Sequence, residues 1–454
     1  MKQQAGLTRR RLVGSALFGA GALPLLPARN LLAAGAAAIT PAEALAMAES
    51  RRAELIDLLA RLIRVRSLSG ESGEVAQGVV MDYLAALPYA VESSRDRPSD
   101  YADHAEYMSP NPPGDGPFVN VVARPKISGS RYALFAHIDT HLLVDGWDSE
   151  PLDPVVRGGR LHGLGTSDDK GGIAAMLIAA AALSEKPGLA PLVISSHGKG
   201  GGSRGSLPVF QKMRDAGESI DALLYIHPAE TGRGLADIKH AVRGALDLTL
   251  TVEGWEGERL EIGLPDSALW KEGGDALERL NQFVAHLKQG VFAGVEVNVG
   301  RLEAGQRSGG VPARAEAQIR LLFEGDYTWR SLLDAVRSEI AAYPQPDAQT
   351  GREFSMRAEP FGTRSNPGAV AWDAPLTQTL RGAIESISGE APKSYPNHFG
   401  GDIRYPLRLL DAPAFGIGSL GGNFYGPNEW VDIDDLVRLV AVVILTLSGW
   451  QEGT

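Results

Sequence analysis

Hydrophobic residues follow helical or strand patterns along most of the chain. Apolar positions at helical spacing, or in an alanine-rich run, predict helices at 41–64, 74–87, 171–183 and 433–450. Short apolar runs predict buried strands at 118–123, 132–136, 192–195 and 222–226. Strands that alternate with helices are typical of an α/β fold with a largely parallel sheet, flanking helices and a functional site at the strand ends.

The pattern changes after residue 243. Alternating apolar and polar residues predict strands at 245–252, 295–299 and 313–323, and helical spacing predicts helices at 275–287 and 327–342. Such an order is typical of a small α+β sandwich. We therefore expect a main domain made of residues 41–243 and 350–454, with residues 244–349 inserted as a second domain.

The N-terminal residues have the order of a targeting signal. Thr8-Arg9-Arg10-Arg11-Leu12-Val13 matches a twin-arginine signal, and an apolar stretch follows it. Small residues around Ala34-Gly35-Ala36 offer a cleavage site. Residues 1–36 therefore predict export, with the periplasm as the destination. The alternative is a cytoplasmic protein with a basic tail.

Composition narrows the classes of partner and metal ligand. The net charge of −11 argues against a nucleic-acid partner, because no basic stripe is present to neutralise phosphates. After residue 40 no hydrophobic run is long enough to span a bilayer. The chain has no cysteine, so any zinc must be held by histidines and carboxylates.

Two segments carry the candidate chemistry. His137-Ile138-Asp139 ends a predicted strand, and side chains at positions i and i+2 of a strand leave the same face, so Asp139 can orient His137. A buried histidine bonded to an aspartate is a common alternative. The glycine-rich turn from Gly163 to Gly172 follows, with Asp168 ahead of a predicted helix. Together the two segments favour a metal site.

Further motifs occur in the order known from the zinc aminoacylase and carboxypeptidase family, which this chain resembles over nearly all of its length after the signal. The family includes acetylornithine deacetylase and succinyl-diaminopimelate desuccinylase. The matching segments are Arg243-Gly244, Gly310-Val311-Pro312, Gly400-Gly401-Asp402-Ile403-Arg404 and Pro427-Asn428-Glu429. The resemblance implies a zinc exopeptidase-like fold with an inserted lid domain. Relatives often dimerise through that insert, which makes a homodimer an expectation here.

The resemblance also implies roles for individual residues. His137 matches the first metal ligand, Asp139 its orienting partner and Asp168 the carboxylate that bridges two zinc ions. His227 aligns with a further ligand, although Glu230 is an alternative. Arg404 is expected to pair with a substrate carboxylate, and a salt bridge with Asp402 or Asp411 is the alternative. His197 and His398 flank the same site; His398 is a candidate substrate contact, although a loop hydrogen bond is the simpler interpretation for each histidine.

The chain departs from the family where the second zinc would bind. Relatives have two adjacent glutamates, the general base and a ligand, where this chain has Lys199-Gly200. Their last histidine ligand is replaced by Tyr425. His137, Asp168 and His227 remain as a set of two histidines and a carboxylate, so the sequence predicts one zinc ion instead of two.

Lys199 has three interpretations. Its amine replaces the missing base if burial and a nearby zinc lower its pKa. Alternatively, its ammonium stands in the place of the second zinc and stabilises a developing oxyanion. The third interpretation is a solvated loop residue without a role.

These observations predict an exported, metal-dependent hydrolase that cleaves the amide bond of an N-acyl amino acid or a small peptide. Two alternatives stay open. One is a relative without catalytic activity that binds a peptide-like ligand. The other is an enzyme adapted to non-hydrolytic acyl transfer or cyclisation, for which the loss of a water-activating base would be useful.

Overall fold

The computed structural model describes residues 39–108, 116–127, 129–199, 202–259, 270–271, 273–306, 308–347, 351–395 and 400–452. The predicted signal at 1–36, Gly200 and His398 lie outside the described residues. Within the described ranges, no helix combines the length and the apolar character needed to cross a membrane.

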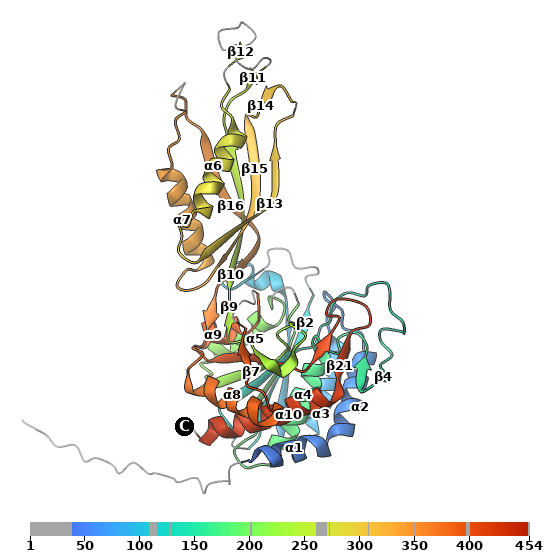
Figure 1. Ribbon diagram of the computed structural model, residues 1–454. Helices are drawn as coiled ribbons and strands as arrows, with labels where there is room; N and C mark the ends of the chain where they lie inside the picture. Colours follow the sequence, from blue (N-terminus) through green and yellow to red (C-terminus); the bar gives the residue numbers. More distant parts are fainter. Residues whose placement is uncertain are drawn as a thin grey trace, which may run out of the picture. The chain divides into compact units, whose positions relative to one another are not determined.

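A six-stranded sheet forms the centre of the main domain (Figure 1). Its strands, in spatial order, are β1 (Tyr89–Asp96), β2 (Phe118–Pro125), β6 (Leu192–Ser196), β3 (Tyr132–His137), β7 (Ala222–Ile226) and β19 (Ala414–Ile417). The last four are mutually parallel, whereas β1 and β2 are antiparallel at one edge. The expected largely parallel sheet with flanking helices is therefore confirmed.

Helices cover both faces of this sheet, and β3 shows why both faces are apolar. Tyr132, Leu134 and Ala136 point into one core, and the alternate residues Ala133 and Phe135 point into another. The first core contains residues of α1 (Pro41–Ser50), α2 (Arg52–Arg64), α3 (Glu74–Ala85), α4 (Lys170–Ser184), α8 (Pro375–Ser388) and α10 (Ile433–Glu452). The second contains residues of α5 (Ser206–Asp215) and α9 (Arg404–Leu409).

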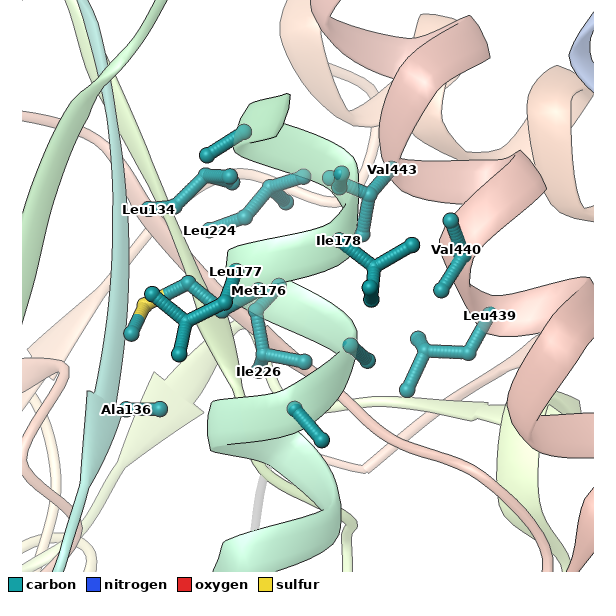
Figure 2. Close-up of a cluster of buried hydrophobic side chains, with 14 of the residues drawn as sticks. Leu134, Ala136, Met176, Leu177, Ile178, Leu224, Ile226, Leu439, Val440 and Val443 are labelled. Atoms are coloured by element: carbon teal, nitrogen blue, oxygen red, sulfur yellow. The ribbon is translucent and has the colours of Figure 1, made fainter. Parts of the chain in front are cut away.

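Helix α4 lies between the sheet and α10, buried on all sides. Figure 2 shows its central side chains between strand residues and helix α10; the labelled residues are Leu134, Ala136, Met176, Leu177, Ile178, Leu224, Ile226, Leu439, Val440 and Val443. The first turn lies very close to β7, because a Cβ on Gly172 would stand 2.0 Å from the carbonyl oxygen of Ile226. This packing holds the turn before α4 against the end of β7.

A second, separate core belongs to an antiparallel sheet of four strands. The spatial order is β13 (Val295–Ala304), β15 (Arg314–Phe323), β10 (Gly244–Glu253) and β16 (Ser355–Ser365), and α6 (Ala276–Lys288) and α7 (Trp329–Ala342) supply helical residues to the core. Every second residue of β15 is buried, as expected for a sheet with one covered face.

One predicted boundary differs from the structure. We expected the chain to return to the main domain at residue 350, yet β16 pairs with β10 in the small sheet. Buried and exposed residues do not alternate regularly along β16. The regular alternation of apolar and polar residues that predicts a strand is therefore missing from this segment. The division into a main domain and an insert stays a prediction.

Short strands and 3₁₀ turns complete the fold. They are β4 (Val155–Arg157), β5 (Arg160–His162), β8 (Asp237–Ile238), β9 (Ala241–Val242), β11 (Gly257–Arg259), β12 (Trp270–Lys271), β14 (Gly310–Val311), β17 (Gly368–Ala369), β18 (Lys393–Ser394), β20 (Gly421–Gly422), β21 (Trp430–Asp432), η1 (Pro98–Tyr101) and η2 (Gly234–Ala236). Of these, β20, β21, β5 and β4 form one small sheet, and Glu429 directly precedes β21.

Candidate metal centre

Three predicted ligands meet at one edge of the central sheet. His137 is the last residue of β3, and His227 directly follows the neighbouring parallel strand β7. Asp168 stands in the turn before α4. All three side chains are buried, and one ligand atom from each lies within 4.8 Å of the other two. The strand ends therefore bring together residues that are far apart in the sequence.

The carboxylate of Asp168 is the centre of this group. His137 Nε2 lies 3.0 Å from its Oδ1, and His227 Nε2 lies 3.3 Å from the same atom. Asp168 Oδ1 is buried and has no hydrogen-bond partner of suitable geometry. Buried polar atoms without partners are rare, and two imidazoles with one carboxylate are a common ligand set for a catalytic zinc ion. The residues present therefore fit a divalent metal ion.

Asp139 holds His137 in place and also fastens the neighbouring loop. His137 Nδ1 lies 2.9 Å from the carbonyl oxygen of Asp139, which can only accept, and 3.4 Å from its carboxylate. The carboxylate accepts from the backbone N–H groups of Gly198 at 2.8 Å and Lys199 at 3.1 Å. Burial opposes the ionisation of Asp139, but the neighbouring imidazoles of His137 and His197 hold its pKa well below the usual range.

The two candidate histidine ligands differ in pKa because their burial and neighbouring charges differ. Burial and Lys199 oppose the charge of His137, but the neighbouring carboxylates of Asp139 and Asp168 raise its pKa to about 10. Burial and the nearby Lys239 lower the pKa of His227 to about 3. His227 is therefore neutral, as a ligand must be, whereas a cation bound at His137 would take the place of a proton.

Lys239 is a site residue that the sequence did not indicate. Its Nζ lies 2.6 Å from His227 Nδ1, which is also 2.8 Å from the carbonyl oxygen of Pro228. These neighbours leave Nε2 of the imidazole turned to Asp168. Burial lowers the pKa of Lys239 to about 8. A lone lysine between the short strands β8 and β9 has no spacing signal, so only the fold could reveal this contact.

The ammonium group of Lys199 binds the other carboxylate oxygen of Asp168. Its Nζ donates to Asp168 Oδ2 and lies 4.9 Å from the ring centre of Tyr425. Burial opposes its charge, but Asp168, then Asp139 and Glu230, raise its pKa. This raised pKa and the ion pair with Asp168 favour the ammonium interpretation, and a solvated loop residue does not fit such a pair. A base whose pKa is lowered by a nearby zinc ion stays a prediction.

Glu429 supports the turn that carries Asp168. Its carboxylate accepts from the backbone N–H groups of Gly165 at 2.8 Å, Ser167 at 2.7 Å and Asp168 at 2.9 Å. Burial and Asp168 raise the pKa of Glu429 to about 7, against the effect of these three N–H groups. The motif Pro427-Asn428-Glu429 marked the segment in the sequence, but not this function of its last residue.

Two other residues from the sequence analysis, Arg404 and His197, bond to groups other than Asp168. Arg404 is fully buried; its Nη1 donates to the carbonyl oxygen of Gly400 at 3.0 Å and its Nη2 to the hydroxyl of Tyr405. The contact between Arg404 and a substrate carboxylate stays a prediction. His197 is buried with Nε2 3.0 Å from the carbonyl oxygen of Ser72, which agrees with a loop hydrogen bond.

The chain is similar to known metallopeptidases and deacylases. A sequence profile described as peptidase family M20/M25/M40 matches residues 133–448. Succinyl-diaminopimelate desuccinylase of Zymomonas mobilis is 24% identical over 395 residues, or 85% of this chain and 95% of that protein. The enzyme of the same name from Rhizorhabdus wittichii is 29% identical over 334 residues, or 72% of this chain and 84% of that protein.

Solved structures show the same fold. Aminopeptidase PepT from Bacillus cereus has a TM-score of 0.63 and 16% identity, and the match covers 87% of this chain and 98% of that one. The M20 family metallo-carboxypeptidase Sso-CP2 from Sulfolobus solfataricus has a TM-score of 0.58 and 16% identity, with 87% and 98% covered.

Proposed function

The chain belongs to peptidase family M20/M25/M40 and is a metal-dependent amide hydrolase, and we propose that it is exported, binds one zinc ion, and releases an amine from an N-acyl amino acid or a small peptide. The observation that carries this proposal is the convergence of His137, Asp168 and His227 on one buried point. The similarity to desuccinylases supports an N-acyl amino acid as the substrate.

The chain's own residues prepare the site for this reaction. His137 and His227 present Nε2 atoms to Asp168, while Asp139 and Lys239 engage their Nδ1 sides. A zinc ion, when bound, polarises a carbonyl and lowers the pKa of water to about 7. The ammonium of Lys199, partly accessible beside Asp168, supplies positive charge for an oxygen that becomes negative during the reaction.

A single metal ion follows from the occupant of the second position. A second cation would have to share Asp168 with the ammonium of Lys199, which already binds Oδ2. A metal ion and an ammonium group that bind the same carboxylate repel each other strongly in a buried site, because both are positively charged. Tyr425 presents a ring and a hydroxyl where the resemblance places a histidine, and the hydroxyl donates to Glu230.

A non-hydrolytic acyl transfer is the second candidate function. It is favoured by one observation: position 199 provides a charged ammonium where a hydrolase of this family has a base. Analysis of products in the presence of a competing amine separates the two functions. Acyl transfer produces a new amide, whereas hydrolysis produces a free carboxylic acid.

Metal content and turnover test the proposal together. We expect purified protein to contain one zinc ion per chain by elemental analysis and to release amine from members of a panel of N-acetyl and N-succinyl amino acids and dipeptides. His137→Ala and His227→Ala should each lose most of the bound zinc, because two protein ligands hold the ion poorly. His286→Ala, a change in the second core's helix α6, is the matched control. Two zinc ions per chain would contradict the single-metal proposal, and a metal-free, inactive protein would contradict the function.

A further inference from the structure

Hydrolysis of an amide requires a group that takes a proton from water. At position 199, where the resemblance places that base, this chain has a lysine whose Nζ donates to Asp168. We propose that Glu230 is this proton acceptor. The inference rests on the proposed function, because it concerns the same site and the same reaction. It assigns to Glu230 a catalytic task that differs from that of a metal ligand.

Glu230 faces the metal group from the end of β7. Its Oε1 lies 2.8 Å from the hydroxyl of Tyr425, which donates to it, and 3.8 Å from His227 Nε2. The second distance is too long for a hydrogen bond. The carboxylate therefore stands beside the point where the candidate ligands converge.

Accessibility distinguishes Glu230 from the other carboxylates around this point. The side chain of Glu230 is 21% exposed, so water and substrate can reach it. The nearby carboxylates belong to residues that are at most 3% exposed: Asp139, Asp168, Asp169, Asp402 and Glu429. The carboxylates of Asp139 and Glu429 accept hydrogen bonds from backbone N–H groups, and Asp168 belongs to the candidate ligand set. Among the described residues of the site, Glu230 is the carboxylate that can contact a reacting water.

The backbone at Glu230 is held in an unfavourable conformation. Its φ is +62°, in the left-handed region that residues other than glycine rarely adopt. Such strain costs about 1–3 kcal/mol and is found mostly at functional sites. The next residue, Thr231, donates its hydroxyl to the buried Asp237, which fixes the loop. The fold therefore maintains a costly conformation that directs this carboxylate to the site.

The proposed step conserves every atom and charge. Glu230 accepts one proton from water while the water oxygen forms a bond to the carbonyl carbon of the amide. The protonated Glu230 then gives that proton to the amide nitrogen as the C–N bond breaks. The products are a carboxylic acid and an amine, and the carboxylate of Glu230 is restored. Tyr425 is a positioning residue in this step, because its hydroxyl orients Oε1.

Glu230→Gln tests the assignment, because it keeps the shape of the side chain and removes its ability to accept a proton. General-base assistance contributes about 10²- to 10⁴-fold, so we expect kcat to fall by that factor on the best substrate of the panel, with little change in KM. Glu230→Asp keeps a carboxylate with a shorter reach and should lose less. Zinc content and thermal unfolding should match those of the wild type. Glu390→Gln, at an exposed position after α8, serves as the control.

Each other result has a defined meaning. Near wild-type kcat in Glu230→Gln would overturn this inference and leave the proposed function intact. Loss of zinc from the folded variant would also overturn it, because Glu230 would then be a ligand. A zinc-loaded wild type that turns over nothing in the panel would refute the proposed function, and this inference with it.

Discussion

A single change of residue type decides the charge distribution of the site. Family resemblance places a glutamate at position 199, and this chain has a lysine that donates to Asp168. The resemblance implies that Asp168 bridges two metal ions. In this chain Asp168 contributes to one candidate metal site and binds one ammonium group. The positive charge is thus part of the polypeptide and does not depend on metal supply.

Lys199→Ala removes this charge without adding a ligand. Removal of one electrostatic stabiliser of a transition state typically reduces kcat by about 10²- to 10³-fold, and we expect a loss of that order. The zinc content should stay at one per chain, because Tyr425 still offers no imidazole. Lys212→Ala, which breaks an ion pair with Asp96 away from the site, is the control. Full turnover in Lys199→Ala would show that the ammonium has no part in the reaction.

Among the elements, α4 determines the position of Asp168. The helix is buried on all sides, and its alanines and glycines allow close contact with β7 and α10. A helix packed in this way cannot shift without disturbing the sheet, because protein interiors are densely packed. The turn before it is held from the other side by Glu429. The ligand geometry therefore depends on core packing as much as on the ligands.

Leu177→Ala tests this dependence on packing. Leu177 is fully buried in the core of Figure 2, and truncation of a buried leucine costs about 2–5 kcal/mol of unfolding free energy. Urea unfolding should show a lower midpoint by the corresponding amount. Val75→Ala, on an exposed position of α3, should change stability by less than about 0.5 kcal/mol. A loss in Leu177→Ala as small as that would mean that the helix does not depend on this contact.

At the scale of the whole molecule, the candidate metal ligands all lie in one part of the fold. The described ligands all lie with the six-stranded sheet, whereas the second core is formed by β10, β13, β15, β16 and two helices. A role for the small sheet in homodimerisation stays a prediction from family resemblance. Export also stays a prediction, since it depends on residues 1–36.

Export has a direct test at the level of the whole chain. The twin-arginine pair is read by a receptor, so the double variant Arg9→Lys, Arg10→Lys should remain in the cytoplasm while the wild type is recovered from the periplasm. Cell fractionation followed by immunodetection provides the measurement. Equal distribution of both variants between the fractions would contradict the predicted signal.

Local pattern was sufficient for much of the fold. The predicted helix at 171–183 is α4, and the predicted strand at 245–252 is β10, because apolar spacing reports directly on local geometry. His137 and Asp168 were also identifiable, since strand ends and glycine-rich turns have sequence signatures. The departure at Lys199-Gly200 was visible for the same reason.

Only the tertiary structure decided what those residues experience. Lys239 contacts His227 through the fold, Arg404 is fully buried, and β16 joins the small sheet despite its irregular pattern. The pKa of Lys199 is raised by carboxylates from distant segments, which no local pattern could have revealed. Burial and charge interactions depend on which segments meet in space, and therefore the sequence determined the candidate chemistry while the fold determined its charge state.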